Sequence, residues 1–240
     1  RAIEISAPDA KTVTFKLKAP LYRMLLDEER ALGDPSLITW VGVTTAKDWS
    51  EIPKPTVMAY EDVMSEDLPE VFEGILKKAS DARTETERIN AVTSEIARAV
   101  RYVGDWRPVR GAFHPRSLKQ IVESGYGDCK DFTVSTGSIL KRLGFEVHAA
   151  WVDRGKDQIV TPLSIAAPDI NHAILFARKD GRDYWVDPTN LTSFAQGIYS
   201  DIANRPAIVL LPQGAALKWI PGLQSRDGRI KIDLKIALAE

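Results

Sequence analysis

The chain has 240 residues, of which 44% are hydrophobic and 27% are charged, and its formal net charge is −1 at pH 7. This size allows one large domain or a core with smaller parts, and the near-zero charge gives no support for binding to nucleic acid or to an acidic membrane surface. No apolar run approaches the roughly 18 to 20 residues that a membrane span needs, and a single cysteine excludes a disulfide framework and multi-cysteine zinc or iron–sulfur sites.

The N-terminal part of the chain is predicted to form strands. Alternating apolar residues indicate two short strands between Ile3 and Leu17, with a turn near Pro8-Asp9, and a further strand from Leu37 to Thr45. The prolines of the stretch from Pro53 to Pro55 indicate a break in regular structure and a linker.

Helices are predicted for the next stretch. Leu68 to Ala79 has a helical pattern, and Thr84-x-x-Glu87 is a capping box that begins a longer helix. One apolar stripe of this longer helix is typical of a core-facing surface rather than a partner-binding groove, and its members are Ile89, Val92, Ile96 and Val100. A short helix is predicted from Pro115 to Gly125.

The single cysteine, Cys129, begins a predicted helix that extends to Leu143, and two glycines precede it in Gly125-Tyr126-Gly127. A thiol in the first turn of a helix lies at the positive end of the helix dipole, which favours thiolate over thiol. Thiolate is the nucleophilic form, so the position suits chemistry. A lone cysteine is also commonly a small buried hydrophobe, and position alone leaves both interpretations open.

A β-hairpin is predicted from His172 to Asp187. Asp180-Gly181 is a turn signal between a strand from Ala173 to Arg178 and a return strand from Asp183. With these two turn residues, position 179 faces 182 and position 172 faces 189. His172 and Asp187 then share one face and lie diagonally adjacent.

This register predicts a catalytic arrangement. A carboxylate that holds one imidazole nitrogen leaves the other nitrogen free to act on a thiol, which is the orienter, base and nucleophile pattern of covalent catalysis. Taken alone, His172 fits a structural role. Together with Asp187 and the helix-borne Cys129, it favours a catalytic site.

The remaining strands are predicted after the cysteine helix. They run from Glu146 to Asp153, from Ile208 to Leu211 and from Ile230 to Ile236, with turns at Pro212-Gln213-Gly214 and Asp227-Gly228. Helices and strands occupy separate stretches of the chain, so the predicted fold class is α+β.

Three segments closely resemble, in order, the signature blocks of the bacterial transglutaminase-like superfamily of papain-related cysteine enzymes: Gly127-Asp128-Cys129-Lys130-Asp131, Asn171-His172-Ala173 and Trp185-Val186-Asp187-Pro188-Thr189. The resemblance implies Cys129 as nucleophile, His172 as general base and acid, and Asp187 as the orienting carboxylate. One departure is Thr133 to Thr136, which is more polar than the Ala- and Leu-rich stretch usual after the cysteine. It bears on the packing of the helix and not on the three blocks.

The same resemblance predicts a papain/transglutaminase-like core, with helices packed on an antiparallel sheet and β segments at both ends. It divides the chain into residues 1–55 as the end of an N-terminal β-sandwich domain, 56–205 as the core and 206–240 as the start of a C-terminal β domain. The start of the chain at Arg1 suggests a fragment or a processed form. The residues do not determine the location; a bacterial periplasmic or secreted protein is favoured over a cytoplasmic one, and if the protein is exported, a lone reactive thiol fits the absence of structural disulfides.

The predicted function is acyl transfer or amide hydrolysis on a peptide or protein amide, of the protease, amidase or transglutaminase type, through a thioester on Cys129. His172 gives a proton to the leaving amine and then activates water or an acceptor amine. The backbone N–H of Cys129 should form half of the oxyanion hole, because the N-terminal amides of a helix lack internal partners. Tyr102 and Trp106 are the candidates for the second donor. No cofactor and no metal ion are expected.

Two other functions fit parts of the sequence. One is a catalytically idle binding or assembly module between β-sandwich domains, although intact cysteine, histidine and aspartate positions argue against a decayed site. The other is a metal site built from the same three residues. The metal site is least favoured, because three protein ligands suit zinc only with a water in the fourth position and a supporting second shell.

Overall fold

The computed structural model describes residues 3–9, 11–19, 44–51, 54–104, 113–155, 170–190, 198–224 and 232–234. The contacts within the chain separate it into two units, Arg1–Val41 and Gly42–Glu240. The first unit contributes a β-hairpin. The second contains the helices and the large sheet.

The hairpin of the first unit consists of β1 (Ile3–Asp9) and β2 (Thr12–Leu17), which pair antiparallel. Its register places Ile3 opposite Leu17, so these apolar side chains lie on one face. Both predicted strands are confirmed. The turn follows Asp9 rather than falling at Pro8-Asp9, and the Asp9 Oδ1 atom accepts a hydrogen bond of 2.8 Å from the backbone N–H of Lys11.

The helices of the second unit precede most of its strands along the chain. They are the short 3₁₀ helix η2 (Trp49–Glu51), α1 (Lys54–Ser65), α2 (Glu70–Ser80), α3 (Glu85–Ala99), α4 (Leu118–Ser124) and α5 (Cys129–Arg142). Capping boxes fix the first turns of α3, α4 and α5, with Thr84, Ser117 and Asp128 at the respective N-caps. Within the described residues, no helix has both the length and the apolar character required to span a bilayer.

Helix α1 corrects the linker predicted from the prolines at positions 53 and 55. The helix nevertheless begins at Lys54 with Pro55 in its first turn, where a proline is tolerated because the backbone N–H has no intrahelical acceptor. The buried residues Val57, Tyr60 and Met64 then recur at helical spacing and fix the helix to the core.

The long strands form one antiparallel sheet with the order β7-β6-β5-β8-β9. These strands are β5 (Glu146–Val152), β6 (His172–Lys179), β7 (Arg182–Val186), β8 (Pro206–Leu211) and β9 (Gly214–Trp219). A separate parallel pair is formed by two short strands, β3 (Arg101–Tyr102) and β4 (Tyr126–Gly127). The second unit is therefore an α+β structure, as predicted.

The domain boundaries at residues 55 and 205 stay predictions, and the described segments beside them belong to the second unit. Strands β8 and β9 extend the same sheet as β5, because the chain returns to the free side of that strand. The η2 segment packs against β9, so residues 44–51 also belong with the second unit. The strand predicted from Ile230 to Ile236 lies mostly outside the described residues, and residues 232–234 have no strand structure.

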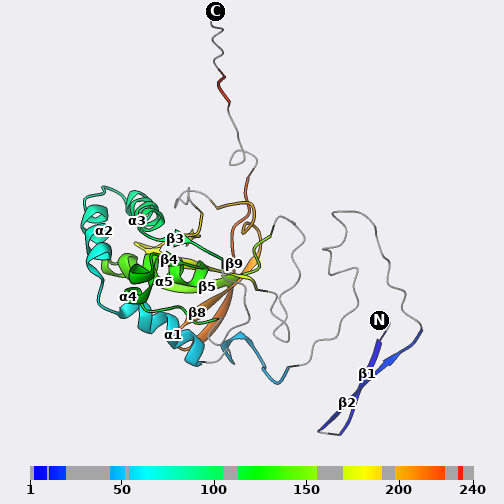
Figure 1. Ribbon diagram of the computed structural model, residues 1–240. Coiled ribbons are helices and arrows are strands. Elements are labelled where there is room, and N and C mark those ends of the chain that lie inside the picture. The colour runs from blue at the N-terminus through cyan, green and yellow to red at the C-terminus, as the bar shows by residue number, and fades with distance from the viewer. Residues whose placement is uncertain are drawn as a thin grey trace, which may run out of the picture. The chain divides into compact units, whose positions relative to one another are not determined.

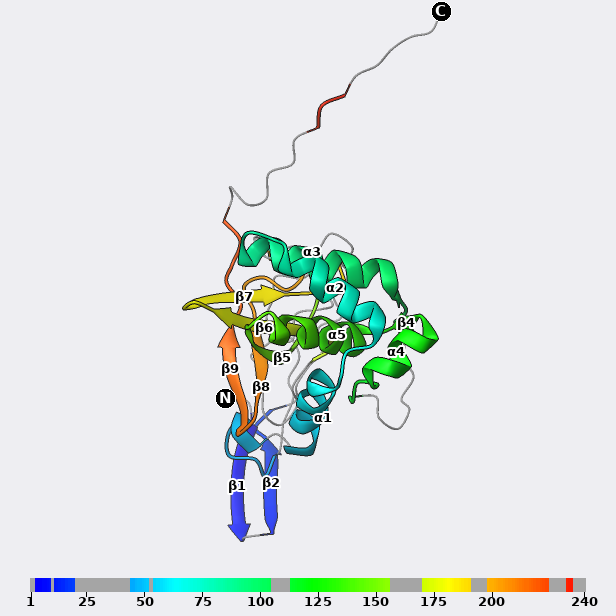
Figure 2. The same cartoon turned by 90° about the vertical axis from the view of Figure 1, so that its left-hand side faces the viewer.

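Helix α5 is the centre of the core. It packs on β5 and β6 and is surrounded by α1, α2, α3 and α4, so that the helices gather on one side of the sheet (Figures 1 and 2). Besides the apolar residues packed around α5, the sheet carries a second apolar cluster. It includes Ile174, Phe176, Trp185 and Val209 of the sheet, which are covered by Ile202 and Ile220. The sheet is thus apolar on both faces.

The polar stretch that follows the cysteine is accommodated inside the core. Thr133, Ser135, Thr136 and Ser138 are fully buried. The Thr133 hydroxyl donates to the carbonyl oxygen of Cys129 at 2.7 Å, and the Ser138 hydroxyl donates to that of Ser135 at 2.8 Å. Such bonds to the preceding turn satisfy a hydroxyl in a buried helix, whereas the hydroxyls of Ser135 and Thr136 are buried without a hydrogen-bond partner among the described residues. The departure from an Ala- and Leu-rich pattern therefore leaves two hydroxyls unsatisfied but does not prevent packing.

Glycine at position 214 is required by the contact between η2 and β9. Gly214 has a φ of +143°, and a Cβ atom there would overlap the carbonyl oxygen of Ser50. We predict that Gly214→Ala lowers the free energy of unfolding by about 2 to 3 kcal/mol, from backbone strain and overlap. Gly74→Ala is the matched control, because a Cβ at Gly74 in α2 meets nothing within 4 Å and should stabilise by about 0.5 to 1 kcal/mol. Urea denaturation of both variants measures the difference, and equal stability losses would contradict it.

Candidate active site

Cys129 lies in the first turn of α5, directly after β4. Its neighbour Asp128 is the N-cap, and the Asp128 Oδ1 atom accepts hydrogen bonds from the backbone N–H groups of Lys130 at 3.0 Å and Asp131 at 3.4 Å. The Cys129 N–H occupies the first helical position, where no intrahelical acceptor exists. Cys129 is half-buried. The thiol therefore lies at the positive end of the helix with a backbone donor beside it.

A buried carboxylate, Asp131, fixes this turn. The Asp131 Oδ2 atom accepts hydrogen bonds from Arg116 Nε at 3.1 Å, from Arg116 Nη2 at 2.8 Å and from the Asp128 N–H at 3.2 Å. Arg116 also donates to the Tyr126 carbonyl oxygen at 2.5 Å and lies over the Tyr126 ring, 4.8 Å from its centroid. The guanidinium thus ties the residues before α4 to β4 and to the start of α5.

The hairpin of β6 and β7 brings His172 and Asp187 together. Lys179 lies opposite Arg182, which is the register predicted from the turn at Asp180-Gly181. The His172 Nε2 atom lies 3.0 Å from Asp187 Oδ2, and the two side chains are only 2% and 1% exposed. The predicted register and the contact between these side chains are confirmed.

Cys129 lies near enough to His172 to contribute to the pKa of the imidazole. Because Nε2 contacts Asp187, Nδ1 is the ring nitrogen left for the thiol. Burial lowers the pKa of His172, but the hydrogen bonds and negative charges of Asp187 and Cys129 outweigh burial and raise this pKa to about 9. The imidazole therefore carries a second proton at neutral pH.

Asp187 accepts hydrogen bonds on both oxygens. Its Oδ1 atom accepts from the Thr189 backbone N–H at 3.0 Å and from the Thr189 hydroxyl at 2.8 Å, and its Oδ2 atom accepts from Asn190 Nδ2 at 3.2 Å in addition to His172. Burial raises the pKa of Asp187, yet the interactions with His172 and Thr189 lower it below its ordinary value. Asp187 thus stays ionised although it is buried.

Of the two candidates for the second oxyanion donor, Tyr102 and Trp106, only Tyr102 lies among the described residues. Tyr102 lies on β3 beside Gly127, and its ring meets Phe132 of α5 edge-on with centroids 5.5 Å apart. Burial and the nearby charge of Cys129 raise the pKa of Tyr102 to about 12, so its hydroxyl stays a donor. Trp106 lies outside the described residues.

His148 belongs to a different cluster. Its Nε2 atom lies 3.2 Å from Glu146 and its Nδ1 atom 3.6 Å from Glu61, which also pairs with Lys141 at 2.8 Å. These contacts join α1, α5 and β5, which is a structural role. Across the described residues, no group of three or more His, Cys, Asp and Glu side chains could hold a metal ion.

Several residues of the site were missed from the sequence. Thr189 and Asn190 directly follow the Asp187-Pro188 pair and could have been noticed as donors beside a carboxylate. Asp128 and Asp131 have capping-box spacing, which gives a local signal. Arg116 and Arg154 gave none, because their partners are distant along the chain.

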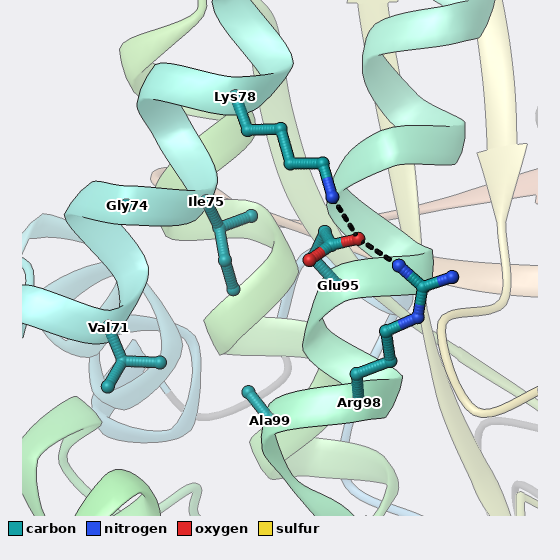
Figure 3. Close-up of a pocket in the computed structure, with 7 residues that line it drawn as sticks. All are labelled: Val71, Gly74, Ile75, Lys78, Glu95, Arg98 and Ala99. Atoms are coloured by element: carbon teal, nitrogen blue, oxygen red, sulfur yellow. Dashed lines mark hydrogen bonds and ion pairs between the residues drawn. The ribbon is translucent and has the colours of Figure 1, made fainter.

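A hollow of about 290 Å³ lies between α2 and α3, away from these residues (Figure 3). It is lined by Val71, Gly74, Ile75, Lys78, Glu95, Arg98 and Ala99. Lys78 and Arg98 both pair with the same oxygen of Glu95. Glu95 thus offsets one of the two positive charges, and the lining of the hollow contains no cysteine, serine, threonine or histidine.

No protein-family model and no curated protein matches the chain. Among solved structures, it is similar to a protein from Parabacteroides distasonis ATCC 8503 described as a "putative protease", with 15% identity and a TM-score of 0.48 over 71% of this chain and 31% of the other. It is also similar to a TGase, with 16% identity and a TM-score of 0.37 over 58% of this chain and 34% of the other. The chain spans about a third of the length of each of these proteins. Both TM-scores lie below 0.5, so the function of the site has to follow from its own geometry.

The ion pair behind the cysteine turn makes a testable contribution to stability. Arg116→Met leaves Asp131 buried without its cation, and we predict that the free energy of unfolding falls by about 2 kcal/mol. Lys119→Met is the control, because Lys119 and Glu123 form an exposed pair on α4 and its loss should change stability by about 0.5 kcal/mol or less. Thermal and urea unfolding compare the two variants. A similar, small effect in both would show that Arg116 does not hold the turn.

Proposed function

We propose that the protein is a cysteine-dependent acyl-transfer enzyme of the transglutaminase-like type, which cleaves or exchanges a peptide or protein amide through a thioester on Cys129. The single observation that carries this proposal is the series Asp187, His172 and Cys129, in which His172 contacts Asp187 at 3.0 Å and lies near enough to Cys129 for that residue to raise its pKa. In this series the cysteine is half-buried while the other two side chains are almost inaccessible. A reagent from solvent therefore meets the thiol first.

The electrostatics of the series support thiolate chemistry. The raised pKa of His172, about 9, keeps the imidazole protonated at neutral pH, and a protonated imidazole next to a sulfur stabilises the thiolate. The N-terminus of α5 adds positive potential on the same atom. Asp187 holds the Nε2–H of His172 and thereby directs Nδ1 to the cysteine.

The first half-reaction forms the thioester. The Cys129 thiolate attacks the amide carbonyl carbon, and the negative charge that develops on the carbonyl oxygen is met by the Cys129 backbone N–H with Tyr102 as the candidate second donor. The His172 Nδ1–H then gives its proton to the leaving amine as the C–N bond breaks. The acyl group remains on sulfur, and His172 is left neutral.

The second half-reaction regenerates the thiolate. Neutral His172 removes a proton from water or from an acceptor amine as that nucleophile attacks the thioester. The C–S bond breaks, the acid or the new amide leaves, and His172 is again protonated beside the thiolate. Water as the nucleophile makes the protein a protease or amidase. An amine makes it a transglutaminase.

Alkylation of the single cysteine tests the ion pair directly. We predict that iodoacetamide labels wild-type Cys129 rapidly at pH 6 and that His172→Ala slows this labelling at least about tenfold, because no imidazolium then stabilises the thiolate. At pH 10, where cysteine thiols ionise unaided, the two proteins should react at similar rates. The ratio of the rate at pH 6 to the rate at pH 10, measured by mass spectrometry, reports the pair.

His148→Ala is the matched control, since His148 is also a buried histidine beside carboxylates but lies in another cluster. It should keep the wild-type ratio. An unchanged ratio in His172→Ala would sink the proposal and favour a catalytically idle binding or assembly module. A library of peptides and glutamine-mimic electrophiles then identifies which acyl groups Cys129 accepts.

The pH dependence of turnover follows from the raised pKa of His172. As pH rises through about 9, the imidazolium loses the proton that the leaving amine needs, so amide turnover should fall. A p-nitrophenyl ester is the control substrate, because its leaving group needs no proton and its acylation should continue above this pH. Stopped-flow measurements from pH 6 to pH 10.5 compare the two. Parallel profiles would mean that His172 is not the general acid.

A further inference from the structure

We propose that Arg154 is a positioning residue of this site, which orients Thr189 and Asn190 so that both donate hydrogen bonds to Asp187. The inference rests on the proposed function, since it assigns a role in the Cys129–His172–Asp187 series. The side chains of Arg154, Thr189, Asn190 and Asp187 have fixed numbers of hydrogen-bond donors and acceptors.

The Arg154 guanidinium uses each of its three nitrogens. Its Nε atom donates to Asp201 Oδ2 at 2.7 Å, its Nη1 atom to the Thr189 hydroxyl at 3.1 Å and its Nη2 atom to Asn190 Oδ1 at 3.1 Å. Its Nη1 atom also lies 3.8 Å from Asp187 Oδ2, the oxygen that contacts His172. The planar guanidinium therefore contacts both residues, Thr189 and Asn190, whose side chains donate to Asp187 in addition to His172.

Because a guanidinium can only donate, these contacts decide how its partners are turned. The Thr189 hydroxyl accepts from Arg154, so its single proton is directed to Asp187 Oδ1 at 2.8 Å. The Asn190 carbonyl oxygen accepts from Arg154, so its NH₂ group is turned to Asp187 Oδ2 at 3.2 Å. Arg154 thus fixes one hydroxyl rotor and one amide orientation, and both present donors to the carboxylate.

The backbone of Arg154 is held by the residue next to His172. The Arg154 N–H donates to Asn171 Oδ1 at 2.7 Å, and Asn171 Nδ2 donates back to the Arg154 carbonyl oxygen at 2.9 Å. The neighbouring Gly155 N–H donates to the Asp201 carbonyl oxygen at 3.0 Å. Arg154 therefore connects the strand end that carries His172 to the segment that follows Asp187.

The charges around Arg154 keep it ionised. Burial lowers its pKa, but the hydrogen bond with Asp201 and the charges of Asp187, Asp201 and Tyr102 raise it above the ordinary value. Its side chain is 31% exposed, against 1% for Asp187. The titratable groups that face Arg154 are Asp187, Asp201 and Tyr102. Asp187 in turn faces His172, which is itself near Cys129.

The test uses the alkylation ratio between pH 6 and pH 10 in Arg154→Met and Arg154→Lys. Arg154→Met should lower the ratio about tenfold, the loss expected when a group that orients a site residue is removed, with the rate at pH 10 within about twofold of wild type. Arg154→Lys should also lower it, because one ammonium cannot reproduce the planar fork. A variant that only loosens the fold would change both rates or neither.

Two controls make the result decisive. Arg178→Met removes a forked arginine from the β6–β7 hairpin, one that pairs with Asp183 near the surface, and should keep the wild-type ratio. His172→Ala tests the series itself. A lowered ratio in His172→Ala with wild-type ratios in both Arg154 variants overturns the role of Arg154 alone, whereas an unchanged ratio in His172→Ala overturns the proposed function.

Arg154→Lys also decides the question if Arg154→Met does not fold, because it keeps a cation beside Asp201. A wild-type ratio in Arg154→Lys would mean that charge suffices without the fork, and would overturn the proposal. Melting temperatures measured alongside identify which variants are folded at the assay temperature.

Discussion

The enclosure of α5 is the constraint on which the rest of the second unit depends. The helix is buried without interruption from Asp131 to Leu140, with the sheet on one side and other helices around it. Buried polar groups of such a helix need partners within the protein, and among the described residues the hydroxyls of Ser135 and Thr136 are the exceptions in α5. Small side chains allow the close approach, and Gly137 is an example, because a Cβ there would come within 3.3 Å of Leu175. Only the first turn, at positions 128–130, remains partly exposed before the buried stretch begins.

This enclosure also explains why the buried charges of the site are grouped as they are. Asp131 and Asp187 are each almost inaccessible, and an isolated carboxylate in such a place would take up a proton. Each is instead surrounded by donors: Arg116 for the first, and His172, Thr189 and Asn190 for the second. The same contacts that stabilise the fold therefore determine the orientation of the candidate catalytic groups.

The sequence predicts the parts of the structure that depend on local signals. The Asp180-Gly181 turn determines the register that unites His172 with Asp187, because a two-residue loop fixes the pairing of its strands. The capping box at Thr84 and the glycines before Cys129 mark helix starts in the same way. The finer prediction of a transglutaminase-like core stays a prediction, as do the catalytic roles.

Contacts between distant segments could not be predicted from one sequence. Nothing near Arg154 indicates that its partners are Thr189, Asn190 and Asp201, since no spacing rule links them. The return of β8 to the free side of β5 likewise depends on tertiary packing. The prolines at the start of α1 indicate a break in regular structure, so that local signals do not predict this helix. Predictions therefore succeeded where turn and cap chemistry act, and failed where packing decides.

The unequal exposure of the site has a consequence for oxidation. Cys129 is the reachable member of the series and the only cysteine in the chain. A thiolate in such a position is readily converted to sulfenic acid, and a neighbouring cysteine usually captures that state as a disulfide. This chain has no second thiol to do so. An external small thiol that forms a mixed disulfide with Cys129 would protect it against further, irreversible oxidation to sulfinic acid.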